Sequence, residues 1–257
     1  MRIDVAPTAD AVVPAELAGV TALVIDVLRA STTIITALAN GCDAIVPVAE
    51  PLDARRRALA TQNGGALVAG ERQGEPIPGF DLSNSPVEFQ SPRVRGMTVY
   101  FTTSNGTRAL LAARAAHAIG VAALVNVTAA AAWAAEAGHD VAILCAGSHG
   151  APSLEDWTCG GLAVARILAA VPAAVLTEAA RDALETGRRY GADVGRLKHD
   201  APWARRLIAA GRAADVDACL RLDTTNLVPR YLPHVDKIVG DRQYLTVVIR
   251  SGDGARA

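Results

Sequence analysis

The residues that follow one apolar run are suited to binding a metal ion and a phosphate group. Residues 20–25 predict a buried strand, and Asp26, Arg29 and Ser31 come directly after it. In an open α/β sheet, ligands bind beyond the carboxyl ends of the strands. A carboxylate suits a hard cation such as Mg²⁺, and an arginine offers phosphate a planar, permanently charged fork. The segment therefore predicts a site for a metal ion and a phosphate group.

Polar turns that contain glycine also follow three other predicted strands. The candidates are Glu71 and Arg72 after residues 66–69; Thr103, Asn105, Gly106 and Thr107 after residues 98–102; and Gly147 after residues 141–145, with Glu155 and Asp156 soon after it. Free amides at the start of a helix, such as those of residues 105–107, can cradle phosphate. Because parallel strands end at the same edge of a sheet, we expect these groups to share one rim with Asp26.

Each of these features also has a purely structural interpretation. Asp26 and Arg29 are spaced to form a local ion pair, although an exposed pair contributes only about 0.2–1 kcal/mol. Residues 71–72 suit a solvated turn, and the Asn-Gly pair at 105–106 tolerates the positive φ of a tight turn. Ser153 and Asp156 match a capping box, which leaves Glu155 as a second acid without an explanation.

A thiol nucleophile is an alternative to metal-assisted chemistry. Cys145 ends a predicted strand and His149 lies four residues later, so the two could form an activated nucleophile. A buried structural role is favoured for Cys145, because free cysteine is among the most buried residue types. Two known phosphatase signatures are absent, since position 150 is glycine rather than arginine and position 28 is leucine rather than a second aspartate. The four cysteines show no CxxC spacing, so we expect neither a zinc knuckle nor a disulfide framework.

Short apolar runs alternate with amphipathic stretches and predict a single α/β domain over residues 1–257. Strands are predicted at 20–25, 44–48, 66–69, 98–102, 122–125, 141–145, 237–239 and 244–249, and helices at 32–40, 52–62, 107–116, 129–137 and 154–170. This order is typical of a three-layer α/β/α fold with a mostly parallel sheet. Residues 70–96 form a long polar loop, which is usually functional or disordered. Residues 178–221 predict an additional helical segment near the C-terminus, as a cap or an insertion.

Composition argues against several other classes of protein. The 257 residues are 51% hydrophobic and 20% charged, which excludes general disorder. A net charge of −1 and an aromatic content of 4% argue against a nucleic acid or a membrane surface as a partner. No uncharged apolar segment reaches the length of a membrane span, and the first ten residues lack the apolar core of a signal peptide, so we expect a cytoplasmic location. The high alanine content is compatible with an apolar surface for self-association, and so with a homo-oligomer.

Several motifs together resemble those of one family, the 2-phosphosulfolactate phosphatases. The matching segments are DVLRASTT (26–33), ANG (39–41), GER (70–72), GFDLSNSP (79–86), TTSNGT (102–107), CAG (145–147) and SLED (153–156). They occur in the expected order over roughly the first two thirds of the chain. Gln73 stands where some relatives have glycine, a change that removes no charged group.

The resemblance implies a Mg²⁺-dependent phosphatase that hydrolyses 2-phospho-3-sulfolactate, or a related 2-phospho acid, to sulfolactate and phosphate, a step of coenzyme M biosynthesis. It adds residues of the loop 70–96 to the candidates. The catalytic candidates are then Asp26, Arg29 and Glu155; the substrate-binding candidates are Ser31, Arg72, Asn84, Ser85, Thr103, Asn105, Gly106, Thr107 and Gly147; and the metal-binding candidates are Asp26, Glu71, Asp81, Glu155 and Asp156. Whether Asp26 attacks phosphorus or holds the metal stays open. A non-enzymatic phospho-ligand-binding protein on the same scaffold is the alternative function.

Overall fold

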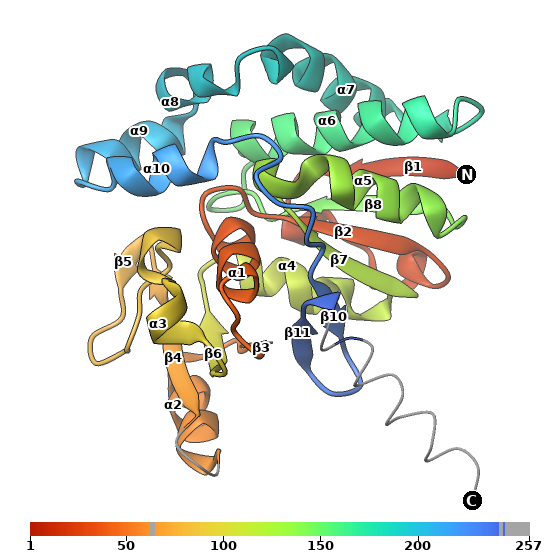
Figure 1. Ribbon diagram of the computed structural model, residues 1–257. Coiled ribbons are helices and arrows are strands. Elements are labelled where there is room, and N and C mark those ends of the chain that lie inside the picture. Colours follow the sequence, from red (N-terminus) through yellow and green to blue (C-terminus); the bar gives the residue numbers. More distant parts are fainter. Residues whose placement is uncertain (62–64, 242–243, 245–257) are drawn as a thin grey trace, which may run out of the picture.

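A large sheet runs through the middle of the molecule (Figure 1). The computed structural model describes residues 1–61, 65–241 and 244, and within them the sheet has 11 strands in the order β5-β4-β6-β3-β11-β10-β7-β2-β8-β1-β9. The strands are β1 (Arg2–Ala6), β2 (Thr21–Ile25), β3 (Ala44–Pro47), β4 (Ala66–Arg72), β5 (Glu75–Pro76), β6 (Thr98–Thr102), β7 (Ala118–Ala122), β8 (Val141–Cys145), β9 (Val175–Leu176), β10 (Arg230–Leu232) and β11 (Lys237–Val239).

The sheet is mostly parallel, as predicted, but it consists of two parallel blocks. One block contains β4, β6 and β3, and the other contains β7, β2, β8, β1 and β9. The antiparallel hairpin β10–β11 lies between them and joins each block through one residue pair, Arg230 with Gly120 and Ile238 with Ile45. Because three antiparallel pairings follow one another (β3 with β11, β11 with β10, and β10 with β7), the strands of one block run in the opposite direction to those of the other. The expectation that all these strands end at one rim of one parallel sheet was therefore wrong, and the polar turns after β2, β4 and β6 meet instead where the two blocks converge.

Helices cover both faces of the sheet and make the predicted three layers. They are α1 (Ala30–Ala39), α2 (Pro51–Ala60), α3 (Ser91–Val94), α4 (Gly106–Ala112), α5 (Val127–Glu136), α6 (Leu154–Ala170), α7 (Glu178–Gly191), α8 (Leu197–Asp200), α9 (Pro202–Ala209) and α10 (Ala213–Cys219). Alternation along β2 sets the layers: Leu23 and Ile25 pack in a core with α5 to α10, whereas Ala22 and Val24 pack in a second core with α1 and α4.

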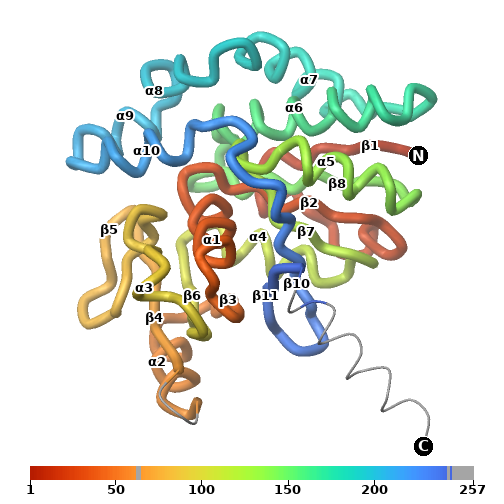
Figure 2. Tube along the Cα trace, viewed as in Figure 1, coloured from red at the N-terminus to blue at the C-terminus, as the bar shows by residue number. Residues whose placement is uncertain are grey.

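The C-terminal helical segment is part of the main core. Residues 178–221 fold into α7 to α10 with a short 3₁₀ turn, as the sequence predicts. Ala183, Leu197, Leu207 and Val216 are buried in the same cluster as the strands β2 and β8. Figure 2 shows the chain passing from α6 over the sheet and then turning down, so that α9 and α10 lie near the start of α1. None of the helices described is both long and apolar enough to cross a membrane.

Some predicted element boundaries were wrong for physical reasons. In place of the strand predicted at 122–125, the structure has β7 at Ala118–Ala122. This strand includes Gly120, a residue type that usually weakens a strand, but a side chain at this position would clash with the ring of Trp133. The short strand β1 was missed, although Ile3 and Val5 are buried and the strand pairs with β8. Residues 237–239 form β11, as predicted, and this strand pairs with β10 and β3. Apart from Tyr244, the strand predicted at 244–249 lies outside the described residues.

Candidate functional site

A small cavity lies where the turns after β2, β4 and β6 meet. Its lining comes from these turns, from the loop 70–96, from the turn after β8 and from helix α9. The lining residues are Asp26, Leu28, Arg29, Glu71, Gln73, Gly74, Asn84, Ser104, Asn105, His149 and Trp203. Five of them (Asp26, Arg29, Glu71, Asn84 and Asn105) are candidates that the sequence proposed.

The backbone around Asp26 turns sharply from β2 into α1. The amide of Asp26 donates to Ser31 Oγ at 3.0 Å, and its carbonyl accepts from the Ser31 amide at 2.8 Å. The Ala30 amide donates to Asp26 Oδ1 at 3.1 Å, so one carboxylate oxygen is fixed by the start of the helix. Oδ2 accepts no hydrogen bond from the described residues. A Cβ atom at Gly106 would lie 2.6 Å from this oxygen, so only glycine allows α4 to begin so close to it.

Arg29 is held by a buried ion pair with a residue that the sequence did not single out. Arg29 Nη1 donates to Asp215 Oδ2 at 2.6 Å, and both side chains are less than 5% exposed. Arg29 Nη2 donates to the Gly74 carbonyl at 3.0 Å. Asp215 lies in α10, and its Oδ1 accepts from Ser85 Oγ at 2.5 Å. Three segments that are distant in the sequence therefore determine where this guanidinium lies.

Glu71 organises the turn that closes the cavity on the β4 side. Its Oε2 accepts from the Gly74 amide at 2.6 Å, and its Oε1 accepts from the Ser104 amide at 2.7 Å. The side chain is buried, and both of its oxygens are used to join the turn after β4 to the turn after β6. Glu71 thus links two turns that line the cavity.

Two adjacent acids at the start of α6 are buried behind Asp26. Asp156 Oδ1 accepts from the Val27 amide at 2.8 Å, and its Oδ2 accepts from the Gly147 amide at 3.2 Å. Glu155 Oε2 is buried and accepts no hydrogen bond within the described part of the chain. The capping box predicted here was wrong, since the Ser153 side chain accepts no hydrogen bond from the described start of α6 and Asp156 turns toward the amides of two other segments.

Burial and mutual repulsion raise the pKa values of these carboxyl groups. Burial, with a contribution from the negative charge of Asp26, raises the pKa of Glu155 to about 7. Burial and the charge of Glu155 raise the pKa of Asp156 to about 7, although the amides of Val27 and Gly147 oppose this shift. Burial likewise raises the pKa of Asp26 well above its ordinary value, and the charge of Asp156 adds to the effect. Such a group of buried acids is costly unless protons or a cation compensate the charge.

The donor set fits a cation that is bound by few protein ligands. Within the described ranges no three His, Cys, Asp or Glu side chains are arranged to chelate one ion. Mg²⁺ commonly uses one or two carboxylates and completes its octahedron with water and phosphate oxygens. Asp26 Oδ2 and the unpartnered Glu155 Oε2 are oxygen donors of this kind, and the buried Asn84 Oδ1, also without a partner among the described residues, is a third.

Other predicted residues support the site or lie outside it. Thr103 and Thr107 bond reciprocally and fix the start of α4, with the Thr107 amide donating to Thr103 Oγ1 at 3.0 Å. The guanidinium of Arg72 donates to the carbonyls of Glu71 and Ala49 and to Thr102 Oγ1, and Arg72 does not line the cavity.

Two further candidates also lie away from the cavity. Asp81 is exposed, and its Oδ2 accepts from the Val68 amide at 2.8 Å, partway along β4. Gly147 has φ +67° and lies against Thr8 and Ala151 in a tight turn. Neither residue lines the cavity, so their place in the fold is explained by the turns that they make.

Trp203 and His149 form the mouth of the cavity. Their rings meet edge to face with centroids 5.9 Å apart, and Trp203 Nε1 donates to the Leu28 carbonyl at 3.1 Å. His149 and Gln73 both have positive φ, a conformation that is uncommon for such residues and clusters at functional sites. Sequence reasoning missed Trp203 and Asp215 because both lie in a helical segment whose pattern is explained by packing alone.

The thiol alternative is disfavoured by the surroundings of Cys145. All four cysteines are free and buried, and Cys145, the last residue of β8, packs in the core. Burial raises the pKa of the Cys145 thiol well above its ordinary value, and the negative charge of Asp156 adds to the shift. His149 is at the cavity mouth, whereas Cys145 does not line the cavity. A reactive thiolate has the opposite requirements.

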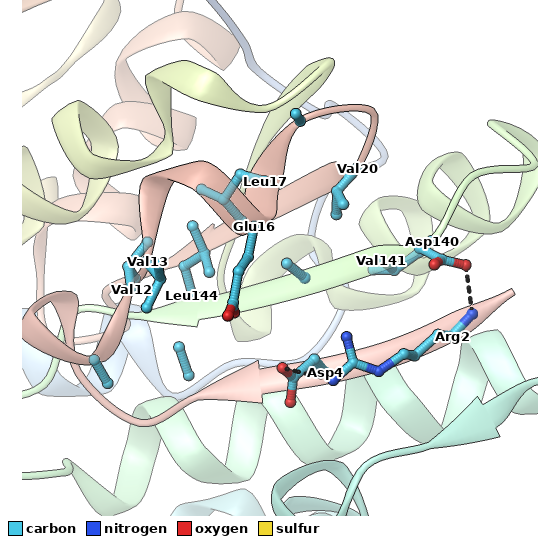
Figure 3. A pocket seen from close by; sticks show the side chains of 14 residues that line it. Arg2, Asp4, Val12, Val13, Glu16, Leu17, Val20, Asp140, Val141 and Leu144 are labelled. Carbon is cyan, nitrogen blue, oxygen red and sulfur yellow. Dashed lines mark hydrogen bonds and ion pairs between the residues drawn. The ribbon is translucent and has the colours of Figure 1, made fainter.

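A second pocket lies beside β1 and β8, away from these residues (Figure 3). Val12, Val13, Leu17 and Val20 come from the segment that leads into β2, and Arg2 and Asp4 come from β1. The amide of Arg2 donates to Asp140 Oδ1 at 2.7 Å at one end of this pocket. It contains none of the predicted site residues, so the chemistry is assigned to the cavity at Asp26.

Comparison with known proteins identifies the family that the motifs predicted. The sequence model of the 2-phosphosulpholactate phosphatase family matches residues 7–233. A probable 2-phosphosulfolactate phosphatase of Symbiobacterium thermophilum is 41% identical over 215 residues, which cover 83% of this chain and 92% of that protein. Proteins of the same description from Deinococcus radiodurans and Clostridium acetobutylicum are 41% and 35% identical and cover 87% and 90% of this chain, and 92% and 97% of their own lengths. The chain therefore belongs to the 2-phosphosulfolactate phosphatase family.

Proposed function

We propose that the protein is a Mg²⁺-dependent phosphatase that hydrolyses 2-phospho-3-sulfolactate, or a related 2-phospho acid, to the hydroxy acid and phosphate. Membership of a family whose relatives are described as phosphosulfolactate phosphatases supports hydrolysis of a phosphate monoester. The observation that carries the proposal is the meeting of Asp26 and Arg29 in one cavity, with the buried Glu155 behind them. A carboxylate, a permanent cation and a buried acid are the groups that phosphoryl transfer requires.

In this proposal Arg29 holds the phosphoryl group. Two of its N–H groups are used by Asp215 and Gly74, and the other donors of the guanidinium have no acceptor in the part of the chain that the structure describes, so they can bind ester oxygens. The amides of Asn105 and Gly106 at the start of α4 would add neutral donors, whereas the Thr107 amide already donates to Thr103 Oγ1. These groups are positioned before substrate binds, so they stabilise the charge of the transition state without reorganisation.

Asp26 and Glu155 supply the remaining chemistry. The two carboxylates would hold Mg²⁺, which when bound polarises the phosphoryl oxygens and offsets their charge. Asp26 Oδ2 is also free to attack phosphorus, with the alcohol as leaving group and an aspartyl-phosphate as product of the first step. In the metal-free protein, the carboxyl group of Glu155, whose pKa is raised to about 7 by burial, can exchange protons near neutral pH.

A panel of 2-phospho acids, assayed for phosphate release with Mg²⁺ and with EDTA, tests the proposal. We expect release that depends on Mg²⁺ and is fastest for substrates that carry a second anionic group. Turnover that persists in EDTA would contradict the metal requirement. Binding of the same compounds without any release would favour a phospho-ligand-binding protein. Mass spectrometry of acid-quenched enzyme separates the two roles of Asp26, because only a nucleophile gains the mass of a phosphoryl group.

A further inference from the structure

We propose that Asp215 is a positioning residue that orients Arg29 toward the phosphoryl group, so that the C-terminal helical segment completes the site. This inference rests on the proposed function for its substrate, but its geometry is independent of the choice among 2-phospho acids. Nothing in the motifs that carry the family resemblance includes Asp215, since they end at residue 156.

The buried pair between Arg29 and Asp215 is more than a structural salt bridge. Arg29 lies at the cavity, 2% exposed, and an arginine there without an anion would be costly to desolvate. Asp215 neutralises this charge from the side of α10, and the carbonyl of Gly74, which lines the cavity, accepts from Nη2. The other N–H groups of the guanidinium have no acceptor among the described residues. The planar fork is therefore presented to a ligand in one orientation.

Both carboxylate oxygens of Asp215 accept hydrogen bonds, and these bonds fix the position of its side chain. Oδ2 accepts from Arg29 Nη1 at 2.6 Å and Oδ1 accepts from Ser85 Oγ at 2.5 Å. Gly74 adds a third constraint, because its carbonyl accepts from Arg29 Nη2 at 3.0 Å while its amide donates to Glu71. Any shift of Asp215 is thus transmitted directly to the guanidinium.

Helix α9 reinforces the same contact between the helical segment and the β2–α1 turn. Trp203 donates to the carbonyl of Leu28, the residue before Arg29, at 3.1 Å. A Cβ atom at Gly74 would lie 3.3 Å from the Trp203 ring, so the ring also packs on the turn that binds Arg29. The helical segment therefore contacts the carbonyl of Leu28, the side chain of Arg29 and the turn at Gly74 that binds this side chain.

The test compares Asp215→Asn with Asp217→Asn, a matched control on the same helix. Asp217 is more than half exposed and pairs with Lys198 at the surface. Two measurements are made on each purified, folded variant: binding of inorganic phosphate by calorimetry in the presence of Mg²⁺, and turnover of the 2-phospho acid panel. We expect Asp215→Asn to weaken phosphate binding and to lower kcat/KM by about 10- to 100-fold, and Asp217→Asn to change neither.

A double-mutant cycle separates positioning from a general structural effect. In an Arg29→Lys background, Asp215→Asn should add little further loss, because a residue that acts through Arg29 has nothing left to orient. Losses that multiply fully in the double variant, or unchanged phosphate binding in Asp215→Asn, would overturn the inference. If wild-type protein releases no phosphate but Asp215→Asn still weakens phosphate binding, the proposed function fails and the positioning role stands.

Ser85→Ala provides the test if Asp215→Asn does not fold. This change removes one hydrogen bond to Asp215 Oδ1 and keeps the ion pair. Loss of one such bond should weaken phosphate binding by about threefold to tenfold. The same affinity as wild type in Ser85→Ala would contradict the claim that a fixed Asp215 sets the orientation of Arg29.

Discussion

At the scale of single residues, Asp26 combines a fixed oxygen with a free one. Oδ1 accepts from the Ala30 amide, and Oδ2 has no donor among the described residues. Asp26→Asn keeps the shape and the Ala30 contact but removes the charge. We expect kcat to fall by at least about 100-fold at saturating Mg²⁺, whether Asp26 is a nucleophile or a metal ligand. Phosphate release measures the loss, and full activity would exclude both roles.

Glu155 makes the stability of the metal-free protein depend on pH. Burial raises its pKa from 4.5 to about 7, so between these values the folded state binds more protons than the unfolded state. The free energy of unfolding should therefore be highest below about pH 4.5 as far as this group is concerned, and fall as the pH rises to about 7. The expected change is on the order of 3 kcal/mol.

Glu155→Gln tests this dependence because it removes the titrating group and keeps the size of the side chain. Relative to wild type, the variant should become progressively more stable as the pH is raised from about 5 to 8. Urea unfolding of metal-free protein at several pH values provides the measurement. Glu136→Gln, at an exposed glutamate of α5, serves as the control. A constant difference between Glu155→Gln and wild type across this range would show that Glu155 does not titrate as its burial implies.

At the scale of elements, the start of α4 is pressed against the start of α1. A Cβ atom at Gly106 would lie 2.5 Å from Ala30 Cβ and 2.6 Å from Asp26 Oδ2. Gly106→Ala must displace one of these groups, and we expect kcat/KM to fall by about 10- to 100-fold while the protein stays folded. Steady-state kinetics together with thermal unfolding tests this expectation. Gly65→Ala is the control, because its nearest neighbour would be 3.9 Å away, and equal activities in the two variants would contradict the close approach.

The elements show which parts of the site a sequence can predict. Asp26, Glu71 and Asn105 were predictable because each lies in or just after a strand, and strand periodicity is a local signal. Arg72 stands beside Glu71 and looked equivalent to it, but its guanidinium turns away to the Ala49 carbonyl. Side-chain direction at a turn depends on neighbouring strands, so the spacing of the residues does not reveal it. Asp215 was unpredictable for the same reason, since its partner is 186 residues away.

At the scale of the whole molecule, the three α/β/α layers were predictable, but the opposite strand directions of the two blocks of the sheet were not. Hydrophobic periodicity identifies strands and helices, but it does not say that the hairpin β10–β11 is inserted between β3 and β7. That pairing depends on contacts such as Ile238 with Ile45, between residues at opposite ends of the chain. The convergence of polar turns on one cavity is thus a property of the assembled sheet.

The same assembly predicts that the helical segment does not unfold separately from the sheet. Helices α6 and α7 pack so closely that a Cβ atom at Gly161 would lie 1.8 Å from the Ala183 carbonyl oxygen. Gly161→Ala should therefore force the helices apart and lower the stability of the protein by at least about 2 kcal/mol, or a Tm decrease of roughly 4–8 °C. Because residues of α7 to α10 share one core with β2 and β8, the loss should appear in a single cooperative transition.

Gly160→Ala is a matched control one residue away on α6. Its added Cβ would meet Ile143 at 3.5 Å, an ordinary van der Waals contact, so we expect a much smaller change in Tm. Circular dichroism and limited proteolysis follow the unfolding of both variants. A Gly161→Ala protein that loses its C-terminal helices first, in a separate transition, would show that the segment is an independent cap. A single transition would mean that Asp215 and Trp203 are held at the cavity by the same core that positions Asp26.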